Sequence, residues 1–136
     1  MDKKSEYQSG LPEAVSKEHL LELFKVFSQH GIANPDDLSL DDPAVIEANR
    51  KFGIWMADCL SRAEESYNPK KAEMELSLEC SMFYIDAGFT DPEYLEEVAY
   101  GRLGGSDLPE AEAAGYTDLV TKINSRILKI DELLGR

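Results

Sequence analysis

The residues that most often carry out chemistry are few in this sequence and lie far apart. There are two cysteines, Cys59 and Cys80, and two histidines, His19 and His30. Zinc sites and nucleophilic cysteine sites use these residue types at recognisable spacings, and the four residues show none of them. Both cysteines fall among apolar residues on expected helices, which indicates small buried thiols in a reducing compartment. We therefore expect a cytoplasmic protein.

The sequence also lacks the familiar catalytic motifs. It contains no Glu-x-x-His pair of a di-iron bundle, no His-Glu-x-x-His and no Gly-x-Ser-x-Gly. His30 is expected in the last turn of a helix, where it can bind free carbonyl groups, and His19 is expected to be exposed. We expect a non-catalytic protein without metal or cofactor. The alternative is a site formed by carboxylates that converge from facing helices.

Carboxylates are the abundant reactive groups, and their excess is large. The chain of 136 residues has 14 lysines and arginines against 27 aspartates and glutamates, a net charge of −13. Residues 86–118 hold nine acidic residues and one basic residue, Arg102, whereas residues 119–136 hold four basic and two acidic ones. Such a surface repels nucleic acid and anionic lipid and attracts basic proteins. The alternative is that the charge serves only solubility.

Six acidic residues in the charged segment are the expected partner-binding site. They follow an expected helix start and continue into the next connector: Asp91, Glu93, Glu96, Glu97, Glu110 and Glu112. A second acidic group, Asp36, Asp37, Asp41 and Asp42, lies earlier in the chain. It lacks the alternating spacing, the central glycine and the closing glutamate of a calcium-binding loop. We interpret these four as residues that complement the positive ends of helices.

The stretch that must organise these elements is residues 68–89, and its pattern favours two structures. From Met74 to Met82 apolar and polar residues alternate, which is typical of a half-buried strand. The residue types favour a helix, Asn68 and Pro69 provide a helix start, and Gly88 provides a helix end. No other segment alternates, so a strand would lack a partner. We predict a helix over residues 69–87.

This helix has two apolar stripes on opposite sides. One contains Ala72, Leu76, Cys80, Phe83 and Ala87, and the other contains Met74, Leu78, Met82 and Ile85. A helix that is apolar on two faces requires neighbours on two sides. We therefore predict an all-α, single-domain bundle of about five helices, in which residues 69–87 form the central helix.

The remaining helices are predicted from apolar periodicity and end signals. The first begins at Pro12 or Ser16 and ends at Gly31, and the second spans about residues 43–65. Gly53 lies in the middle of the second helix, where it costs about 1 kcal/mol relative to alanine unless another helix approaches closely. A further helix begins at Asp91-Pro92 and is expected to stop at Gly104-Gly105. It is followed by an acidic, polar connector over residues 107–115 that contains a short helical turn. Residues 1–10 are expected to form a flexible tail, and residues 11–136 one domain.

The last helix has a heptad-like seam. Tyr116, Val120, Ile123, Ile127, Ile130 and Leu134 recur at spacings of four and three, and Thr117 is the expected cap. Fewer than three heptads are short for a free coiled coil, so we expect this seam to pack on the central helix within the same chain. A homodimer through the same seam is the alternative.

These features define the expected function. We expect an acidic helical protein that blocks a basic partner, such as a nuclease, toxin or nucleic-acid-binding protein, as an immunity protein or a phage-type inhibitor does. No sequence motif connects the chain to a particular family of such proteins. The alternatives are a housekeeping or regulatory helical domain, as a monomer or homodimer, and a bundle that binds a small molecule or metal.

Overall fold

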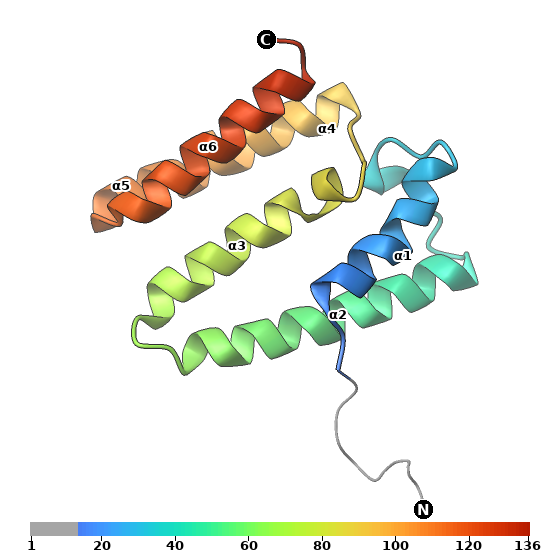
Figure 1. The fold of residues 1–136 in the computed structure, drawn as a ribbon, viewed down its shortest axis with the longest axis horizontal. Helices are drawn as coiled ribbons and strands as arrows, with labels where there is room; N and C mark the ends of the chain where they lie inside the picture. Colours follow the sequence, from blue (N-terminus) through green and yellow to red (C-terminus); the bar gives the residue numbers. More distant parts are fainter. Residues whose placement is uncertain (1–13) are drawn as a thin grey trace, which may run out of the picture.

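The computed structural model describes residues 14–136 and forms an all-α, single-domain bundle (Figure 1). The expected N-terminal tail and the start option at Pro12 lie outside the described residues. Eight helical elements follow one another among the described residues, with these bounds: α1 Lys17–Gln29, η1 Pro35–Asp37, α2 Pro43–Glu64, α3 Pro69–Asp86, α4 Pro92–Glu96, η2 Glu97–Asp107, α5 Leu108–Ala114 and α6 Thr117–Leu133. None of the described helices combines the length and apolar composition needed to cross a bilayer.

Helix α3 is the central helix, as predicted, and ends one residue earlier than expected. The Asn68 side chain accepts a hydrogen bond from the backbone N–H of Lys71 and so caps the helix start. At the other end Gly88 has a φ of 100°, and the N–H groups of Gly88 and Phe89 donate to the carbonyls of Ile85 and Tyr84. This pair of bonds is the Schellman arrangement that glycine permits after a helix.

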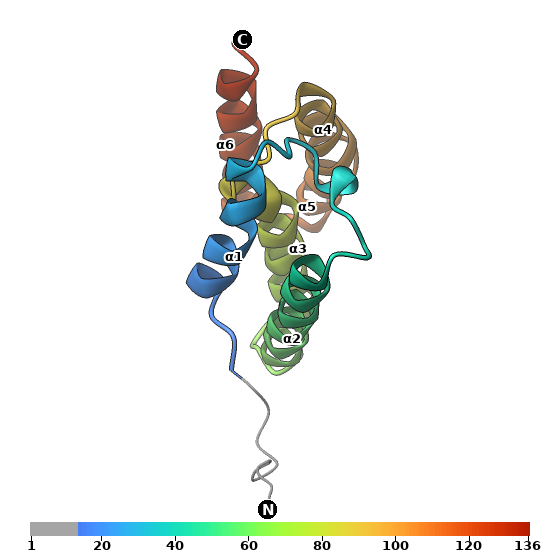
Figure 2. The ribbon, with the colours of Figure 1, turned by 90° about the vertical axis from the view of Figure 1, so that its right-hand side faces the viewer.

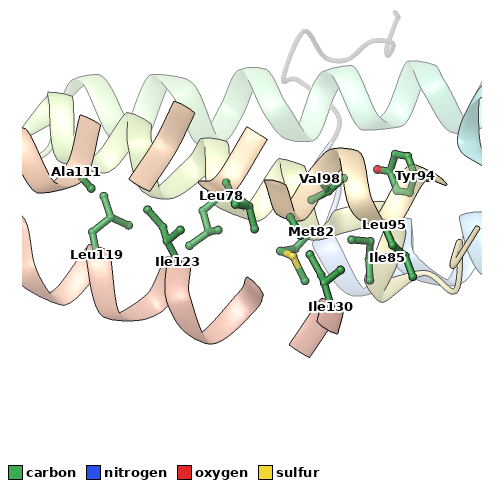
Figure 3. Packing of buried hydrophobic residues seen from close by; sticks show 12 residues of the cluster. Leu78, Met82, Ile85, Tyr94, Leu95, Val98, Ala111, Leu119, Ile123 and Ile130 are labelled. Carbon is green, nitrogen blue, oxygen red and sulfur yellow. The ribbon is translucent and has the colours of Figure 1, made fainter. Parts of the chain in front are cut away.

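The two apolar stripes of α3 enter two separate cores. Leu78, Met82 and Ile85 pack with α4, η2, α5 and α6, in a cluster called here the α6-side core (Figure 3). Leu76 and Phe83 pack with α1 and α2, in the α2-side core. Figure 2 shows α3 between these two groups of helices. A helix buried on opposite sides in this way explains why its apolar residues alternate in the sequence.

Aromatic rings dominate the α2-side core. The ring of Phe83 lies edge-on to the rings of Phe24 and Phe52, with centroids 5.4 and 4.8 Å apart. The sole tryptophan, Trp55, is buried beside Phe52 and Phe83. Edge-to-face pairs of this kind add stability beyond the burial of their area.

The expected helix stop at Gly104-Gly105 is wrong. The chain remains helical from Pro92 to Ala114, and its middle part, η2, is a π-helix that joins α4 directly to α5. The helical turn expected within residues 107–115 is present as α5, but it continues η2 directly and no connector separates the two. A Cβ on Gly104 would lie 3.0 Å from the Ala99 carbonyl oxygen, and one on Gly105 would lie 2.9 Å from that of Tyr100. The glycines thus allow the wider turn instead of ending the helix.

Helix α6 packs within the chain, as expected. Its seam residues face the α6-side core, where Ile123 and Ile130 are fully buried and Ile127 is partly buried. The expected cap at Thr117 is wrong by one residue, because Tyr116 is the capping position and makes no side-chain bond to the helix. Leu128 and Leu133 lie outside the seam and are exposed.

Candidate functional site

The long helix from Pro92 to Ala114 carries five of the six predicted partner-binding residues, and the sixth caps it. The Asp91 carboxylate accepts hydrogen bonds from the backbone N–H of Tyr94, at 3.2 Å, and from the Asn34 amide, at 3.4 Å. The Asp91 N–H donates to the Ala33 carbonyl. Asp91 therefore positions the helix start and holds it against the turn that precedes η1.

Two of the predicted acidic residues lie exposed on the first turns of this helix. Glu93 has no ion-pair partner among residues 14–136, and the Glu97 carboxylate lies 3.9 Å from the Arg102 guanidinium. Glu96, which is less exposed, accepts a hydrogen bond from Arg136 at 2.7 Å. Exposed pairs such as these contribute at most about 1 kcal/mol. Glu93 and Glu97 are therefore accessible to a partner.

The other two predicted residues lie at the far end of the same helix. Glu110 and Glu112 are exposed on α5, roughly 20 to 25 Å along the helix from Glu93. Residues two apart on a helix point in different directions, so these two glutamates do not share one face. The structure therefore brings Glu93 and Glu97 together and leaves Glu110 and Glu112 apart from them.

The fold adds two carboxylates to this region that the sequence pattern had assigned to helix starts and not to the partner-binding site. Asp36 and Asp37 are exposed on η1, which follows directly after Asn34, the residue bound to Asp91. Figure 2 shows η1 close to the start of α4. Asp36, Asp37, Glu93 and Glu97 together are called here the acidic face. No local pattern could have found this group, because the contact spans 57 residues of chain.

The pKa of the buried phenol of Tyr94 responds to charges of the acidic face. Burial raises the pKa of its phenol to about 12, and Asp36 and Glu97 add to the rise, while Arg102 opposes it. The Tyr94 hydroxyl is buried without a hydrogen-bond partner in the described structure. Asp36 and Glu97 thus act on the same phenol, although they come from different elements.

The basic residues of α6 are largely engaged by α3. Lys71 of α3 binds Asp118 at 2.7 Å, and Lys122 and Lys129 bind Glu75 and Asp86. A pocket of about 230 Å³ lies between α1, α3 and α6, lined by three basic and three acidic side chains over Leu78 and Met82. Its charges cancel, and its volume is below the usual range for ligand sites. Lys122 and Lys129 therefore compensate carboxylates of α3, whereas Arg136 pairs with Glu96 and Arg102 lies beside Glu97 of the acidic face.

The histidines and cysteines lie in environments typical of residues with a structural role. The His30 ring nitrogen Nδ1 lies 2.6 Å from the Val26 carbonyl, as expected for a helix end, and His19 is exposed near Lys51. Cys59 and Cys80 are free, half-buried thiols, and burial raises the pKa of each. A thiol with a raised pKa is a weak nucleophile. Among residues 14–136 there is no cluster of ligands suited to a metal ion.

The pKa of one further carboxyl group, that of Asp107, is shifted. Burial, reinforced by Glu110, raises the pKa of Asp107, whose Oδ2 atom has no hydrogen-bond partner in the described chain. A perturbed acid is a candidate for proton transfer only beside a second reactive group. None of the cysteines or histidines is among the groups that perturb it, and Asp107 borders none of the three described pockets.

Comparisons with protein-family models, curated proteins and solved structures find no match to this chain.

Proposed function

We propose that this protein is a non-catalytic binding protein whose acidic face occupies a basic surface on another protein. The observation that carries the proposal is that Asp36 of η1 and Glu97 of η2 both act on the phenol of Tyr94, between elements that the Asn34–Asp91 hydrogen bond joins. Asp37 and Glu93 are exposed on the same two parts of the chain, and Arg102 is a nearby cation. A nuclease, toxin or nucleic-acid-binding protein displays lysine and arginine to hold phosphate, and exposed carboxylates compete for the same groups. Blocking such a partner is the activity of an immunity protein or a phage-type inhibitor.

The electrostatic distribution supports this function. The chain carries a net charge of −13, and Lys17, Lys122 and Lys129 are paired with carboxylates of α3. Long-range attraction of this kind accelerates association with a basic partner and weakens as salt increases. The half-buried free thiols support a reducing, cytoplasmic setting.

The test is a pull-down of basic proteins from the native host at low and moderate salt. The double variant Asp36→Asn/Glu93→Gln should lose the partner, with association slowed roughly tenfold, because steering charges change association rates more than other surface residues do. The control Glu64→Gln/Glu65→Gln removes the same charge from exposed positions at the end of α2. Equal losses in both variants, or binding that is indifferent to salt, would contradict the proposal.

The alternative function is a housekeeping or regulatory helical domain whose charge serves solubility. The observation that favours it is the exposure of Leu128 and Leu133 on α6, which offers apolar contacts outside the seam. Under this alternative both double variants should lower solubility by similar amounts, and no basic protein should be retained by either.

A further inference from the structure

The two cysteines lie on neighbouring helices that pack against each other. Cys59 is on α2 and Cys80 is on α3, and both are free, partly buried thiols that contact the α2-side core. Residues 65–68 form a tight connection between the two helices, which therefore run antiparallel (Figure 1). Two thiols on antiparallel helices can react with each other only if they lie at the same level along the helices.

Ring contacts between α2 and α3 establish that level. The ring centroids of Trp55 on α2 and Phe83 on α3 lie 6.1 Å apart. Cys59 follows Trp55 by four residues and Cys80 precedes Phe83 by three, so each cysteine lies about one turn closer to the connection. In an antiparallel pair these two steps run in the same direction. Cys59 and Cys80 therefore lie at the same level on the two helices.

The electrostatic surroundings of the two thiols agree with this placement. Burial raises the pKa of the Cys80 thiol, and Glu79 and Cys59 add to the rise. Lys17 and Glu79 act on both thiols. The two sulfur atoms thus share charged neighbours and influence each other.

Packed helices also provide the separation that a disulfide requires. Disulfides join Cα atoms about 4.4 to 6.8 Å apart. The axes of packed helices are about 8 to 10 Å apart, and Cα atoms lie about 2.3 Å from each axis. Residues at the same level of such a contact are therefore within the range that a disulfide bridges.

Cys59 is the thiol that a small oxidant can reach. It lines a pocket of about 270 Å³ between α2 and α3, together with Arg62 and Glu79. The Arg62 guanidinium donates a hydrogen bond of 3.4 Å to the Cys59 sulfur. A cation beside a thiol favours the thiolate, which is the form that attacks an oxidant. Burial outweighs this effect and raises the pKa of Cys59, so the attack is slow.

We propose that Cys59 and Cys80 form a redox-active pair that hydrogen peroxide converts into an intramolecular disulfide between α2 and α3. The Cys59 sulfur attacks the peroxide, so that an S–O bond forms, the O–O bond breaks and water leaves with the thiol proton. The Cys80 sulfur then attacks the Cys59 sulfur, so that the S–S bond forms, the S–O bond breaks and a second water leaves. Two thiols are oxidised, and one peroxide is reduced to two waters.

The disulfide would close a loop of about 20 residues around the connection between the helices. A crosslink of this kind constrains the unfolded chain and so stabilises the folded one. It acts on the α2-side core and leaves the acidic face unchanged, so this inference does not rest on the proposed function.

Treatment of the full chain with hydrogen peroxide tests this proposal, with the remaining thiols alkylated by N-ethylmaleimide after denaturation. The oxidised wild type should take up no alkylating group and should keep the mass of one chain, and reduction with dithiothreitol should restore the uptake at both cysteines. A tryptic digest should contain residues 52–62 linked to residues 72–102. The urea midpoint of the oxidised protein should be higher than that of the reduced protein.

Variants identify the role of each residue, and circular dichroism verifies that their helices persist. Cys80→Ser should lose the alkylation of Cys59 without recovery on reduction, because the oxidised sulfur then has no internal thiol to react with. Arg62→Gln should slow the loss of thiols several-fold in the wild-type pair. Arg126→Gln removes the same charge from an exposed position on α6 and should leave the rate unchanged.

A wild type whose two thiols remain open to alkylation after prolonged oxidation would overturn the proposal. So would thiols that are lost only to disulfides between chains, or lost without recovery on reduction. An Arg62→Gln rate equal to that of the wild type would overturn the assignment of Cys59 as the thiol attacked first.

Discussion

At the scale of single residues, the notable feature is a polar atom that burial leaves unbonded. Tyr94 is 5% exposed, and its hydroxyl has no hydrogen-bond partner in the described structure. Leaving a buried hydroxyl unpaired costs about 1 to 3 kcal/mol. The tyrosine ring fills the core beneath the acidic face, but its hydroxyl does not stabilise the fold.

Tyr94→Phe should therefore stabilise the protein at neutral pH by about 1 kcal/mol. The variant should also change the response to base. The phenol of the unfolded chain loses its proton near pH 10 and that of the folded chain near pH 12. The free energy of unfolding therefore decreases progressively as the pH rises between these values. The free energy of unfolding of the wild type should fall by about 2 to 3 kcal/mol between pH 10 and pH 12 because of this phenol. The variant lacks the phenol, so this part of the fall should be absent.

Urea unfolding at pH 7, 10 and 12 measures both effects of Tyr94→Phe. Tyr67→Phe is the matched control, because Tyr67 is fully exposed and the same atom is removed. A Tyr94 variant that is less stable than the wild type at pH 7 would show that the hydroxyl is bonded in solution.

At the scale of elements, the π-helix η2 is the departure from ordinary geometry. It spans Glu97–Asp107 and keeps the chain helical through Gly104 and Gly105. Because the wider turn brings a carbonyl five residues back into contact with each glycine, these two positions have no room for a side chain. π-Helical turns are rare and often lie at functional sites, and this one begins at Glu97, on the helix that carries two residues of the acidic face.

Gly105→Ala should lower the free energy of unfolding by more than about 1 kcal/mol, since its Cβ would meet the Tyr100 carbonyl oxygen at 2.9 Å. Gly101→Ala is the control in the same helix, because its Cβ would make an ordinary contact at 3.8 Å with the Glu97 side chain. The control should be neutral or stabilising. Thermal unfolding followed by circular dichroism compares the two, and equal effects would exclude a special role for the wide turn.

At the scale of the whole molecule, α3 joins two cores into one cooperative unit. Each core uses one side of α3, so unfolding of either core removes half of the surroundings of this helix. Single domains of this size usually unfold in one transition. We therefore expect a destabilising substitution in the α6-side core to lower the stability of the α2-side core as well.

Ile123→Ala provides the test, because Ile123 is buried in the α6-side core and Trp55 reports from the α2-side core. The substitution should lower stability by about 2 to 5 kcal/mol. The unfolding midpoint from Trp55 fluorescence should fall together with the midpoint from circular dichroism. An unchanged Trp55 transition beside a lowered circular-dichroism transition would show that the two cores unfold independently.

The sequence by itself determined the central helix and the division of its faces. Asn68, Gly88 and the two stripes act within a few residues of chain, where capping and periodicity decide the outcome. The same local rules predicted the inward seam of α6 and the cap at Asp91. They could not predict η2, because Gly104 and Gly105 are compatible with both a helix stop and a π-helix, and packing against α6 favours the helix.

Only the tertiary structure decided how the charges are grouped. Asp36 and Glu97 are distant in sequence, yet both act on the phenol of Tyr94, and the Asn34–Asp91 hydrogen bond joins the elements that carry them. Glu110 and Glu112 follow soon after Glu97 in sequence, yet the continuous helix carries them away from it. The physical reason is that local propensity acts over a few residues, whereas a surface is formed by elements that meet only after their apolar faces have packed.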